Sequence, residues 1–356
     1  MSKVRLDVAH ARNVAAALLR GVGVPDDDAH LTADCLVYAD RRGTASHGLL
    51  RLPLYLSALV AGGINPRAQM RWVNSHPGGG LLHADGALGQ VAMGQAVEFI
   101  AERIEASPVV AVVVQDSTHY GAGAYWSDLI ADLGCVALIT STTGPVAAPH
   151  GAHRTILGSN PLTIALPAGP EGHLTADIAT SAGAYGKVVE AANAGEQIPP
   201  GWAVDPTGRP TTDPDQALRG ALVAMGGHKG SALMVALEGL SAALGSAAYA
   251  FETEDIWVNP ASRMNVGHTL IALNPAFFGG TDHTAARVQT LREAVRGAGE
   301  PGAVHAPGDI ELARAARHTR TIEVAATTVT AINDLAQAHH TPLLQPDDQA
   351  RDDPAS

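Results

Sequence analysis

The fold is decided by the stretch Val109-Val110-Ala111-Val112-Val113-Val114-Gln115-Asp116-Ser117-Thr118-His119-Tyr120-Gly121-Ala122-Gly123-Ala124. Its Val-rich start predicts a buried strand, and the small residues after the polar turn predict the beginning of a helix. A second apolar run at 136–140 and Ala-rich segments at 91–104 and 126–133 continue the alternation. Strands that alternate with helical segments predict an α/β core from about residue 70 to residue 300.

The polar turn in this stretch is also a candidate binding site. Small residues at the start of a helix let backbone N–H groups approach an anion such as a pyrophosphate. A turn of this kind is also typical of close packing without any function, so both interpretations stay open. Neither the dinucleotide fingerprint G-x-G-x-x-G after a predicted strand nor the P-loop pattern G-x-x-x-x-G-K-[ST] occurs. Nucleotide binding would therefore be of a non-Rossmann kind.

Helices are predicted before this core, over about residues 6–62. Residues 6–19 carry apolar side chains at helical spacing, and Pro25 with the acidic run 26–28 starts a second helix that ends near Asp40. A third helix is predicted from near Leu49 to the glycines that precede Pro66.

Three further predictions concern the second half of the chain. Segment 186–216 is dense in Pro, Gly and Asp and is predicted to be a long loop with Trp202 as its anchor. An apolar helix is predicted over about 321–336. Residues 341–356 are predicted to be a disordered tail because they are rich in Pro, Asp and Gln.

The composition excludes several classes of protein. A formal charge of -12 over 356 residues argues against nucleic acid or an anionic membrane as partner, because both need a concentrated basic face. No run approaches the ~18 apolar residues of a membrane span, and no secretory signal follows Met1, so a cytoplasmic protein is expected. Cys35 and Cys135 offer neither a disulfide framework nor a metal spacing. The pair His150 and His153 lacks further ligands, so no metal is expected.

The first candidate catalytic group lies around His47. Gly43 and Gly48 flank Ser46 and His47, so the backbone can turn sharply and present the imidazole into a cavity. The guanidinium of Arg51 can bind a carboxylate through two hydrogen bonds and hold the adjacent carbon near an imidazole, which moves protons at neutral pH. The alternative interpretation is a helix-capping Ser, a surface His and a structural Arg.

Glycine also accompanies polar groups later in the chain, in the segments 158–162, 177–188 and 226–230. Besides Lys3, the sequence has only the lysines Lys187 and Lys229, and both fall in these segments. A lysine in a glycine-rich turn can contact a phosphate or a carboxylate, and an exposed, solvated lysine is the alternative.

Taken together, the motifs resemble the malate/L-lactate dehydrogenase family that is unrelated to the Rossmann-type enzymes of the same names. That family also includes ureidoglycolate, sulfolactate and 2,3-diketogulonate oxidoreductases and piperideine-2-carboxylate reductase. The resemblance runs in collinear order over about residues 4–335. Its motifs are Arg42-Gly43 to His47-Gly48 with Arg51, His119-Tyr120-Gly121, 149–161, 177–187, Ile198-Pro199 with Gly201-Trp202, Pro210-Thr211-Thr212-Asp213-Pro214, and 226–230.

The resemblance implies both an architecture and an activity. It implies a non-Rossmann α/β fold in which a helical domain, residues 1–70, is joined by a C-terminal helix of about 305–340 and adjoins a mixed-sheet cofactor-binding domain, residues 71–304. It implies a homodimer with the active site near the subunit interface. The implied reaction is hydride transfer between NADH or NADPH and a small 2-oxo or 2-hydroxy acid.

The resemblance also implies residue roles. His47, oriented by Ser46, would donate or accept the proton, and His119 is a second candidate for this role. Arg51 would hold the substrate carboxylate, with Ser159 and Thr180 facing the substrate. The residues expected to line the cofactor are Tyr120, Gly121, Ala122, Gly123, Ala124, Asp177, Ile178, Ala179, His228, Lys229, Pro307, Gly308 and Asp309.

Lys187 is placed with the catalytic residues and bears on the substrate class. The family's hydroxy-acid dehydrogenases carry Lys at this position and its imino-acid reductases an acidic residue, so Lys187 favours a hydroxy acid. The alternative is an imine reductase that acts on a cyclic or N-alkyl 2-imino acid. A third hypothesis is a cofactor-binding protein that has lost catalysis. The joint presence of Ser46, His47, Arg51 and His119 argues against it.

Overall fold

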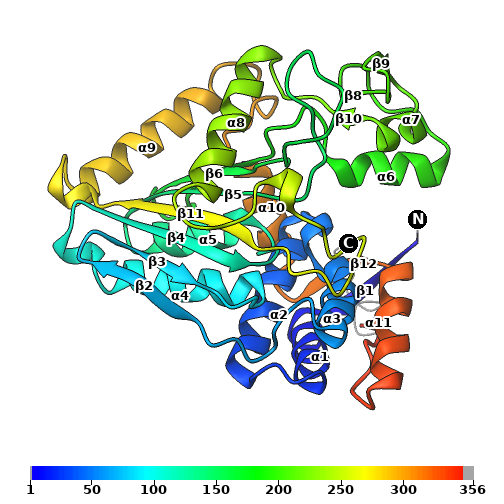
Figure 1. The fold of residues 1–356 in the computed structure, drawn as a ribbon. Helices are drawn as coiled ribbons and strands as arrows, with labels where there is room; N and C mark the ends of the chain where they lie inside the picture. The colour runs from blue at the N-terminus through cyan, green and yellow to red at the C-terminus, as the bar shows by residue number, and fades with distance from the viewer. Residues whose placement is uncertain (1, 348–356) are drawn as a thin grey trace.

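The computed structural model describes residues 2–347, and its centre is a seven-stranded mixed sheet with the order β2-β3-β4-β11-β5-β6-β7 (Figure 1). Only β3 and β4 run parallel, and every other neighbouring pair is antiparallel. This order is not that of a doubly wound sheet, so the predicted non-Rossmann α/β class is confirmed. The strands are β2 (Arg71–His76), β3 (Gly79–His83), β4 (Val109–Ser117), β5 (Val136–Ser141), β6 (Leu162–Leu166), β7 (Leu174–Ile178) and β11 (Val266–Leu273).

Helices cover both faces of this sheet. Val110, Val112 and Val114 of β4 are fully buried in the core that they share with α4 (Gly89–Ala101) and α5 (Gly123–Asp132). The other face of the sheet is turned toward α8 (His228–Ala242). On that face, the Thr269 hydroxyl of β11 donates to the Leu240 carbonyl at 2.9 Å. Figure 1 accordingly shows α4 and α5 on one side of the sheet and α8 on the other. The predicted strands at 109–114 and 136–140 are central strands.

A second core lies in the helices near the N-terminus. It unites residues of α1 (Val8–Gly21), α2 (Asp26–Arg42) and α3 (Leu52–Ala61) with α11 (Ala326–Ala338). A two-stranded antiparallel sheet, β1 (Lys3–Asp7) with β12 (Thr321–Ala325), joins the two ends of the chain. The helix predicted over 321–336 is therefore wrong at its start. Ile322 and Val324 are buried alternately because they belong to a strand that pairs with β1.

A small unit forms between residues 185 and 222, where the sequence predicted a long loop. It contains α6 (Tyr185–Ala194), α7 (Pro214–Arg219) and a three-stranded sheet of β10 (Ala221–Leu222), β8 (Ala203–Val204) and β9 (Pro210–Thr211). The loop prediction is corrected here, because strands of two residues leave no periodic signal. Trp202 does anchor the unit: a Cβ on Gly183 would lie 2.3 Å from its indole ring.

A buried ion pair ties the helices to the sheet. The guanidinium of Arg42 in α2 lies 2.7 Å from the Asp128 carboxylate in α5. Tyr38 and Thr175 donate to the same carboxylate, each at 2.7 Å. Since Thr175 belongs to β7, one carboxylate connects α2, α5 and the edge of the sheet.

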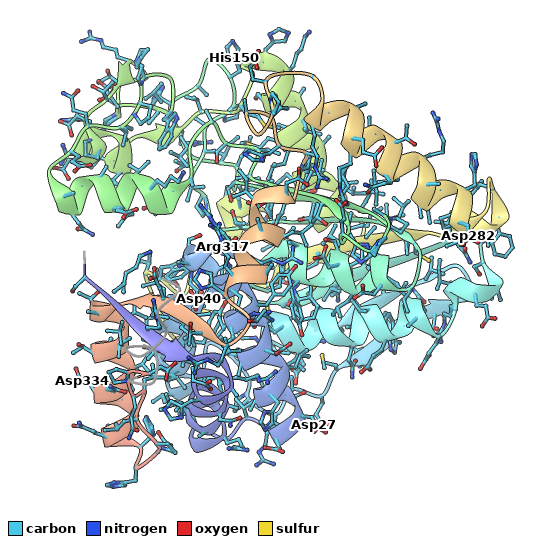
Figure 2. The ribbon with its side chains drawn as sticks, turned by 180° about the vertical axis from the view of Figure 1, so that it is seen from behind. Asp27, Asp40, His150, Asp282, Arg317 and Asp334 are labelled. Atoms are coloured by element: carbon cyan, nitrogen blue, oxygen red, sulfur yellow. The ribbon has the colours of Figure 1, made fainter. Side chains whose placement is uncertain are left out.

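The remaining helices are α9 (Thr281–Arg296) and α10 (Asp309–Arg317). α10 contacts α2, and in Figure 2 Arg317 and Asp40 mark this region in the middle of the molecule. Residues 341–347, predicted to begin a disordered tail, instead pack on α11, where Leu344 is buried and its N–H donates to Asn333 at 2.7 Å. The rest of that predicted tail, 348–356, lies outside the described residues. No helix of residues 2–347 has the length and apolarity that a membrane crossing requires.

Candidate active site

His47 and Arg51 lie on two single turns of 3-10 helix that lead into α3. These turns are Ala45–His47 and Leu49–Arg51, so α3 begins at Leu52, slightly later than the sequence predicted. The Ser46 hydroxyl lies 3.0 Å from His47 Nδ1, and Arg51 Nε donates to the Ser46 carbonyl. Ser46 thus contacts both predicted residues, one through its side chain and the other through its backbone.

The carboxyl group of Asp40, in α2, contacts the backbone of these turns. A Cβ on Gly48 would lie only 2.1 Å from the Asp40 carboxyl, so no other residue fits at this position without movement. The Leu49 N–H donates to Asp40 Oδ2 at 2.8 Å. Burial raises the pKa of Asp40 to about 7, although the Leu49 hydrogen bond lowers it.

His119 follows the end of β4 by two residues and stacks on His47. The two ring centroids are 5.5 Å apart, with planes inclined by 21°. The sequence predicted both histidines, and the fold brings them together. His119 Nδ1 lies 2.6 Å from the Tyr55 hydroxyl, to which the Gln90 amide donates at 3.1 Å.

Both imidazoles are held neutral. Burial, followed by the positive charge of Arg51, lowers the pKa of His47 to about 4. The same two causes, with smaller effects of His47 and His268, lower the pKa of His119 well below its ordinary value. The two rings are half-buried and share a partly desolvated environment next to a permanent cation.

Arg51 has no close carboxylate partner among residues 2–347, although Asp255 attracts it from a distance. Its guanidinium lies 3.9 Å from the ring centroid of Trp257, which is 44% exposed and also meets His119 edge-on at 6.3 Å. Burial raises the pKa of Asp255 to about 6. Four residues of this site were not predicted from the sequence: Trp257, Asp255, Tyr55 and Gln90. Only Tyr55 carried a usable signal, since it follows Arg51 by about one helical turn.

The predicted cofactor segment around Tyr120 is close-packed. A Cβ on Gly123 would lie 2.1 Å from the Thr163 hydroxyl. Asp177 Oδ1 accepts from that hydroxyl at 2.8 Å, and its Oδ2 accepts from the Ala124 N–H at 2.9 Å. The Asp177 carboxylate therefore accepts from a backbone N–H at the α5 N-terminus that was predicted to bind a pyrophosphate. Beside it, Ile178 and Ala179 are exposed.

Ser159 and Thr180 lie together, but they differ in access. Thr180 is fully buried, and its hydroxyl donates to the carbonyls of Ser159 at 2.8 Å and Asn160 at 3.1 Å. The Ser159 N–H donates to the Thr143 hydroxyl at 3.0 Å. Thr180 therefore supports the Ser159 backbone, whereas Ser159 itself is half-buried.

The remaining predicted residues lie on other elements. Lys187 is exposed on α6, and no hydrogen bond or ion pair of residues 2–347 joins it to His47 or His119. His228 and Lys229 are exposed at the start of α8, behind two glycines with positive φ. Pro307 is exposed and Gly308 buried, while Asp309 is bound to Arg296 through two contacts of 2.8 Å.

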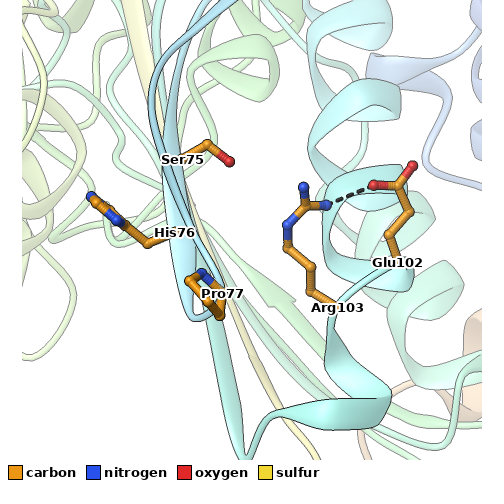
Figure 3. A pocket seen from close by; sticks show the side chains of 5 residues that line it. All are labelled: Ser75, His76, Pro77, Glu102 and Arg103. Carbon is orange, nitrogen blue, oxygen red and sulfur yellow. Dashed lines mark hydrogen bonds and ion pairs between the residues drawn. The ribbon is translucent and has the colours of Figure 1, made fainter.

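A shallow pocket lies elsewhere, between the β2–β3 hairpin and the end of α4 (Figure 3). Its lining includes His76 and the exposed ion pair of Arg103 with Glu102. None of its residues belongs to the His47 cluster, so we do not assign the active site there. Across residues 2–347, no three His, Cys, Asp or Glu side chains are grouped to hold a metal ion.

A third histidine, His268 of β11, contacts Tyr120 next to the site and was not predicted. Its Nδ1 is 2.9 Å from the Ser141 hydroxyl and its Nε2 2.9 Å from the Ser117 hydroxyl. Its ring meets Tyr120 edge-on at 4.9 Å. Burial lowers the pKa of His268 to about 3.

Comparison with known proteins places this geometry in one family. Residues 6–333 match the family described as malate/L-lactate dehydrogenase. The L-sulfolactate dehydrogenase of Methanocaldococcus jannaschii is 36% identical over 297 residues, which cover 83% of this chain and 85% of the relative. The solved structure of sulfolactate dehydrogenase from that organism has a TM-score of 0.88 at 32% identity and covers 95% of this chain and 98% of its own.

Two further relatives bear on cofactor and substrate. The (2R)-3-sulfolactate dehydrogenase (NADP(+)) of Chromohalobacter salexigens is 36% identical over 292 residues, 81% of this chain and 87% of the relative. The Δ1-pyrroline-2-carboxylate/Δ1-piperideine-2-carboxylate reductase of Pseudomonas putida is 33% identical over 275 residues, 76% and 80% of the two chains. These matches confirm the predicted resemblance and, with it, the predicted class of nicotinamide-dependent oxidoreductase.

The buried neutral state of His268 predicts a pH dependence of stability. An unfolded histidine takes up a proton near pH 6.5, whereas folded His268 stays neutral down to about pH 3. The unfolding free energy should therefore fall as the pH drops below about 6.5, with a slope from this group of about 1.4 kcal/mol per pH unit. In denaturant unfolding between pH 6 and pH 4, the slope should be steeper in the wild type than in His268→Asn by about this amount, because His47 and His119 contribute equally in both proteins.

Ser117→Ala is the matched control, because it removes one hydrogen-bond partner and keeps the titrating imidazole. It should lower stability at every pH and retain the slope. Asp40 and Asp255 act in the opposite sense, because carboxyl groups with raised pKa values lose their contribution as the pH rises. The difference between variant and wild type therefore isolates His268. Equal slopes in wild type and His268→Asn would contradict the assignment.

Proposed function

The chain belongs to the malate/L-lactate dehydrogenase family, and on that premise we propose that it transfers a hydride between NADH or NADPH and a small 2-oxo or 2-hydroxy acid. One observation carries the proposal most directly: an Arg without a close carboxylate partner among residues 2–347 lies next to two stacked, neutral histidines. A half-buried cation attracts a carboxylate more strongly than an exposed one, because less water screens the charge. The imidazoles then lie where the carbon beside that carboxylate reacts.

Arg51 would bind the substrate carboxylate, and its position is already fixed. Its Nε is committed to the Ser46 carbonyl, while the ring of Trp257 supports the plane of the guanidinium. The terminal nitrogens remain for a ligand. In the reducing direction, His47 would give a proton to the oxygen that becomes the hydroxyl, and in the oxidising direction it would take that proton back.

A nicotinamide cofactor fits part of the predicted residue set, and it supplies the hydride when bound. Gly226 has positive φ and open space where a Cβ would stand, and the exposed His228 and Lys229 follow it. This donor set suits an anionic group such as the pyrophosphate. The exposed Ile178 and Ala179 suit an apolar ring face. By contrast, Thr180 and Asp309 are taken up by contacts within the chain, so we give them supporting roles.

We propose the substrate class from the presence of Lys187 and from the names of the relatives. Lys187 favours a hydroxy acid by the family pattern, and the sulfolactate dehydrogenases act, by their names, on a hydroxy acid that carries a second anion. The imine reductase among the relatives keeps a cyclic 2-imino acid as the second candidate. The two classes share the carboxylate and differ only in the atom that receives the proton.

We also propose that the active protein is a homodimer. Exposed apolar side chains lie on the 3-10 turn before α3, on α3 and on the segment 255–262: Leu50 is 53% exposed, Val60 68% and Val258 80%. The two parts are in contact, because a Cβ on Gly63 would lie 2.2 Å from the Pro260 carbonyl. Such exposed apolar surface next to a site is typical of a subunit interface.

Light scattering on the purified chain tests the dimer. The wild type should have twice the monomer mass, and Val258→Glu should dissociate it, because a buried charge without a partner is costly. Leu244→Glu is the control, since Leu244 is 59% exposed and lies away from α3, after the end of α8. A monomeric wild type would reject this proposal.

The activity is tested by following oxidation of NADH and of NADPH with a panel of substrates. The panel contains 2-oxo acids with and without a second anion, the same acids with methylamine, and a cyclic 2-imino acid. We expect turnover with 2-oxo acids alone, without need of amine. Turnover confined to the cyclic imine or to the amine mixtures would establish the second candidate, and cofactor binding without any turnover would overturn both.

Two variants test the assigned roles on the best substrate from the panel. His47→Ala should lower kcat by about 10²–10⁴-fold, the usual contribution of a general acid, while the cofactor still binds. Arg51→Lys should mainly raise KM, because a lysine cannot reproduce a planar two-point contact. An unchanged kcat in the first or an unchanged KM in the second would remove that residue from its role.

A further inference from the structure

We infer that Tyr55 and Gln90 are positioning residues that lock His119 in a single tautomer, with its proton on Nε2. In the proposed reaction, on which this inference rests, His119 then serves as a neutral hydrogen-bond donor to the substrate oxygen, and His47 alone moves the proton. Neither Tyr55 nor Gln90 was predicted from the sequence, and the assignment rests on their geometry.

The three side chains form one chain of hydrogen bonds that begins in the core. Gln90, at the start of α4, and Tyr55, on α3, are both fully buried. Gln90 Nε2 donates to the Tyr55 hydroxyl oxygen at 3.1 Å. The hydroxyl hydrogen of Tyr55 is therefore free for His119 Nδ1, which lies 2.6 Å away. Nδ1 accepts this hydrogen and must itself be unprotonated.

The direction of these bonds follows from the cost of the reverse arrangement. As placed, Gln90 has one buried atom without a hydrogen-bond partner among the described residues, its carbonyl oxygen Oε1. A flipped amide would put that oxygen against Tyr55 and bury both amide hydrogens without an assigned acceptor. Buried donors are left unpaired more rarely than acceptors, which tolerate partial satisfaction. The placed orientation is therefore favoured, and it makes Tyr55 the donor to His119.

The lock has a chemical consequence for His119. A neutral ring that accepts at Nδ1 carries its hydrogen on Nε2, and no residue in the part of the chain that the structure describes binds this second nitrogen. If Nε2 gave its proton away, the ring would become an anion unless Tyr55 gave up its own proton at once. Burial raises the pKa of Tyr55 above its ordinary value, so Tyr55 keeps that proton. His119 can stabilise a developing alkoxide but does not protonate it.

His47, unlike His119, can gain and lose a proton, because its Nδ1 faces the Ser46 hydroxyl, which can rotate. Ser46 can donate to a neutral ring and accept from a protonated one. In the reducing direction, His47 first takes up a proton from solvent and becomes an imidazolium. The hydride then adds to the carbon, the C=O electron pair moves to oxygen, and that proton leaves His47 to form the O–H bond. His47 ends neutral, and the Nε2–H of His119 remains in place throughout.

The first test reads the tautomer directly and does not need a substrate. In the apoprotein labelled with ¹⁵N-histidine, the side-chain shifts of His119, assigned by their loss in His119→Gln, should show Nε2 protonated and Nδ1 bare. Tyr55→Phe should turn this into a mixture of tautomers. Tyr38→Phe is the matched control, because it removes a hydroxyl that binds Asp128 instead, and it should leave the His119 shifts unchanged. Protonation at Nδ1 in the wild type, or unchanged shifts in Tyr55→Phe, would overturn the lock.

The second test is kinetic and separates the lock from general folding effects. Tyr55→Phe should lower kcat about 10-fold to 100-fold with little change in KM, a smaller loss than that of a whole oxyanion donor. In the reducing direction, the alkaline limb of the kcat profile, on which His47 loses its proton, should persist in Tyr55→Phe and vanish in His47→Ala. If Tyr55→Phe fails to fold, Gln90→Leu gives the same readouts, because it frees Tyr55 to reverse its bond. Loss of this alkaline limb in Tyr55→Phe would reject the division of roles.

The two tests also separate this inference from the proposed function. If no oxo or imino acid on the panel is reduced, the kinetic readout fails together with the proposed function. The nitrogen shifts of the apoprotein still decide whether Tyr55 sets the tautomer of His119. A protein that turns over oxo acids but shows a mixed tautomer in the wild type would keep its function and lose this inference.

Discussion

The contact between the Asp40 carboxyl and the backbone of Gly48 and Leu49 is the constraint on which the site depends. No side chain fits at Gly48, and the Leu49 N–H has its partner on Asp40. The two short turns that carry His47 and Arg51 are too small to be stable alone, because single turns of 3-10 helix contain few hydrogen bonds. They are held by a buried group of α2, and α2 is in turn joined to the sheet by Arg42 and Asp128. The position of the catalytic candidates is therefore a property of the contact between helices and sheet.

The electrostatics follow from the same burial. Desolvation is the largest cause of the lowered pKa values of His47, His119 and His268. A stack of imidazoles beside a guanidinium would repel strongly if the rings were charged, and partial burial makes that repulsion larger. The fold avoids the cost by keeping the rings neutral and giving each a hydroxyl partner, from Ser46, Tyr55, or the pair Ser117 and Ser141.

The sequence was informative where a local pattern determined the structure. The Val-rich run of β4 could only be a buried strand, and the motif residues His47, Arg51 and His119 do lie together. It failed where long-range pairing decided the outcome: β12 is a strand because β1 lies beside it, although its residues continue into a helix. The hydrogen bond between Ala124 and Asp177 was not predicted for the same reason, because the two residues lie on different elements. Tyr55 and Gln90 are ordinary residues of helices, and only packing reveals that Gln90 binds Tyr55 and Tyr55 binds His119.

The substrate carboxylate would complete the electrostatics of the proposed site. Arg51 lowers the pKa values of both His47 and His119, after burial. A bound carboxylate neutralises Arg51 and so removes this part of the shift, which raises the pKa of both rings toward their ordinary range. The two rings respond differently, because protonated His119 would have to displace the hydrogen that Tyr55 donates, whereas His47 needs only the Ser46 hydroxyl to rotate. Binding of the anion would thus prepare the proton on His47 and leave His119 neutral, which couples substrate recognition to the protonation state that the reaction uses.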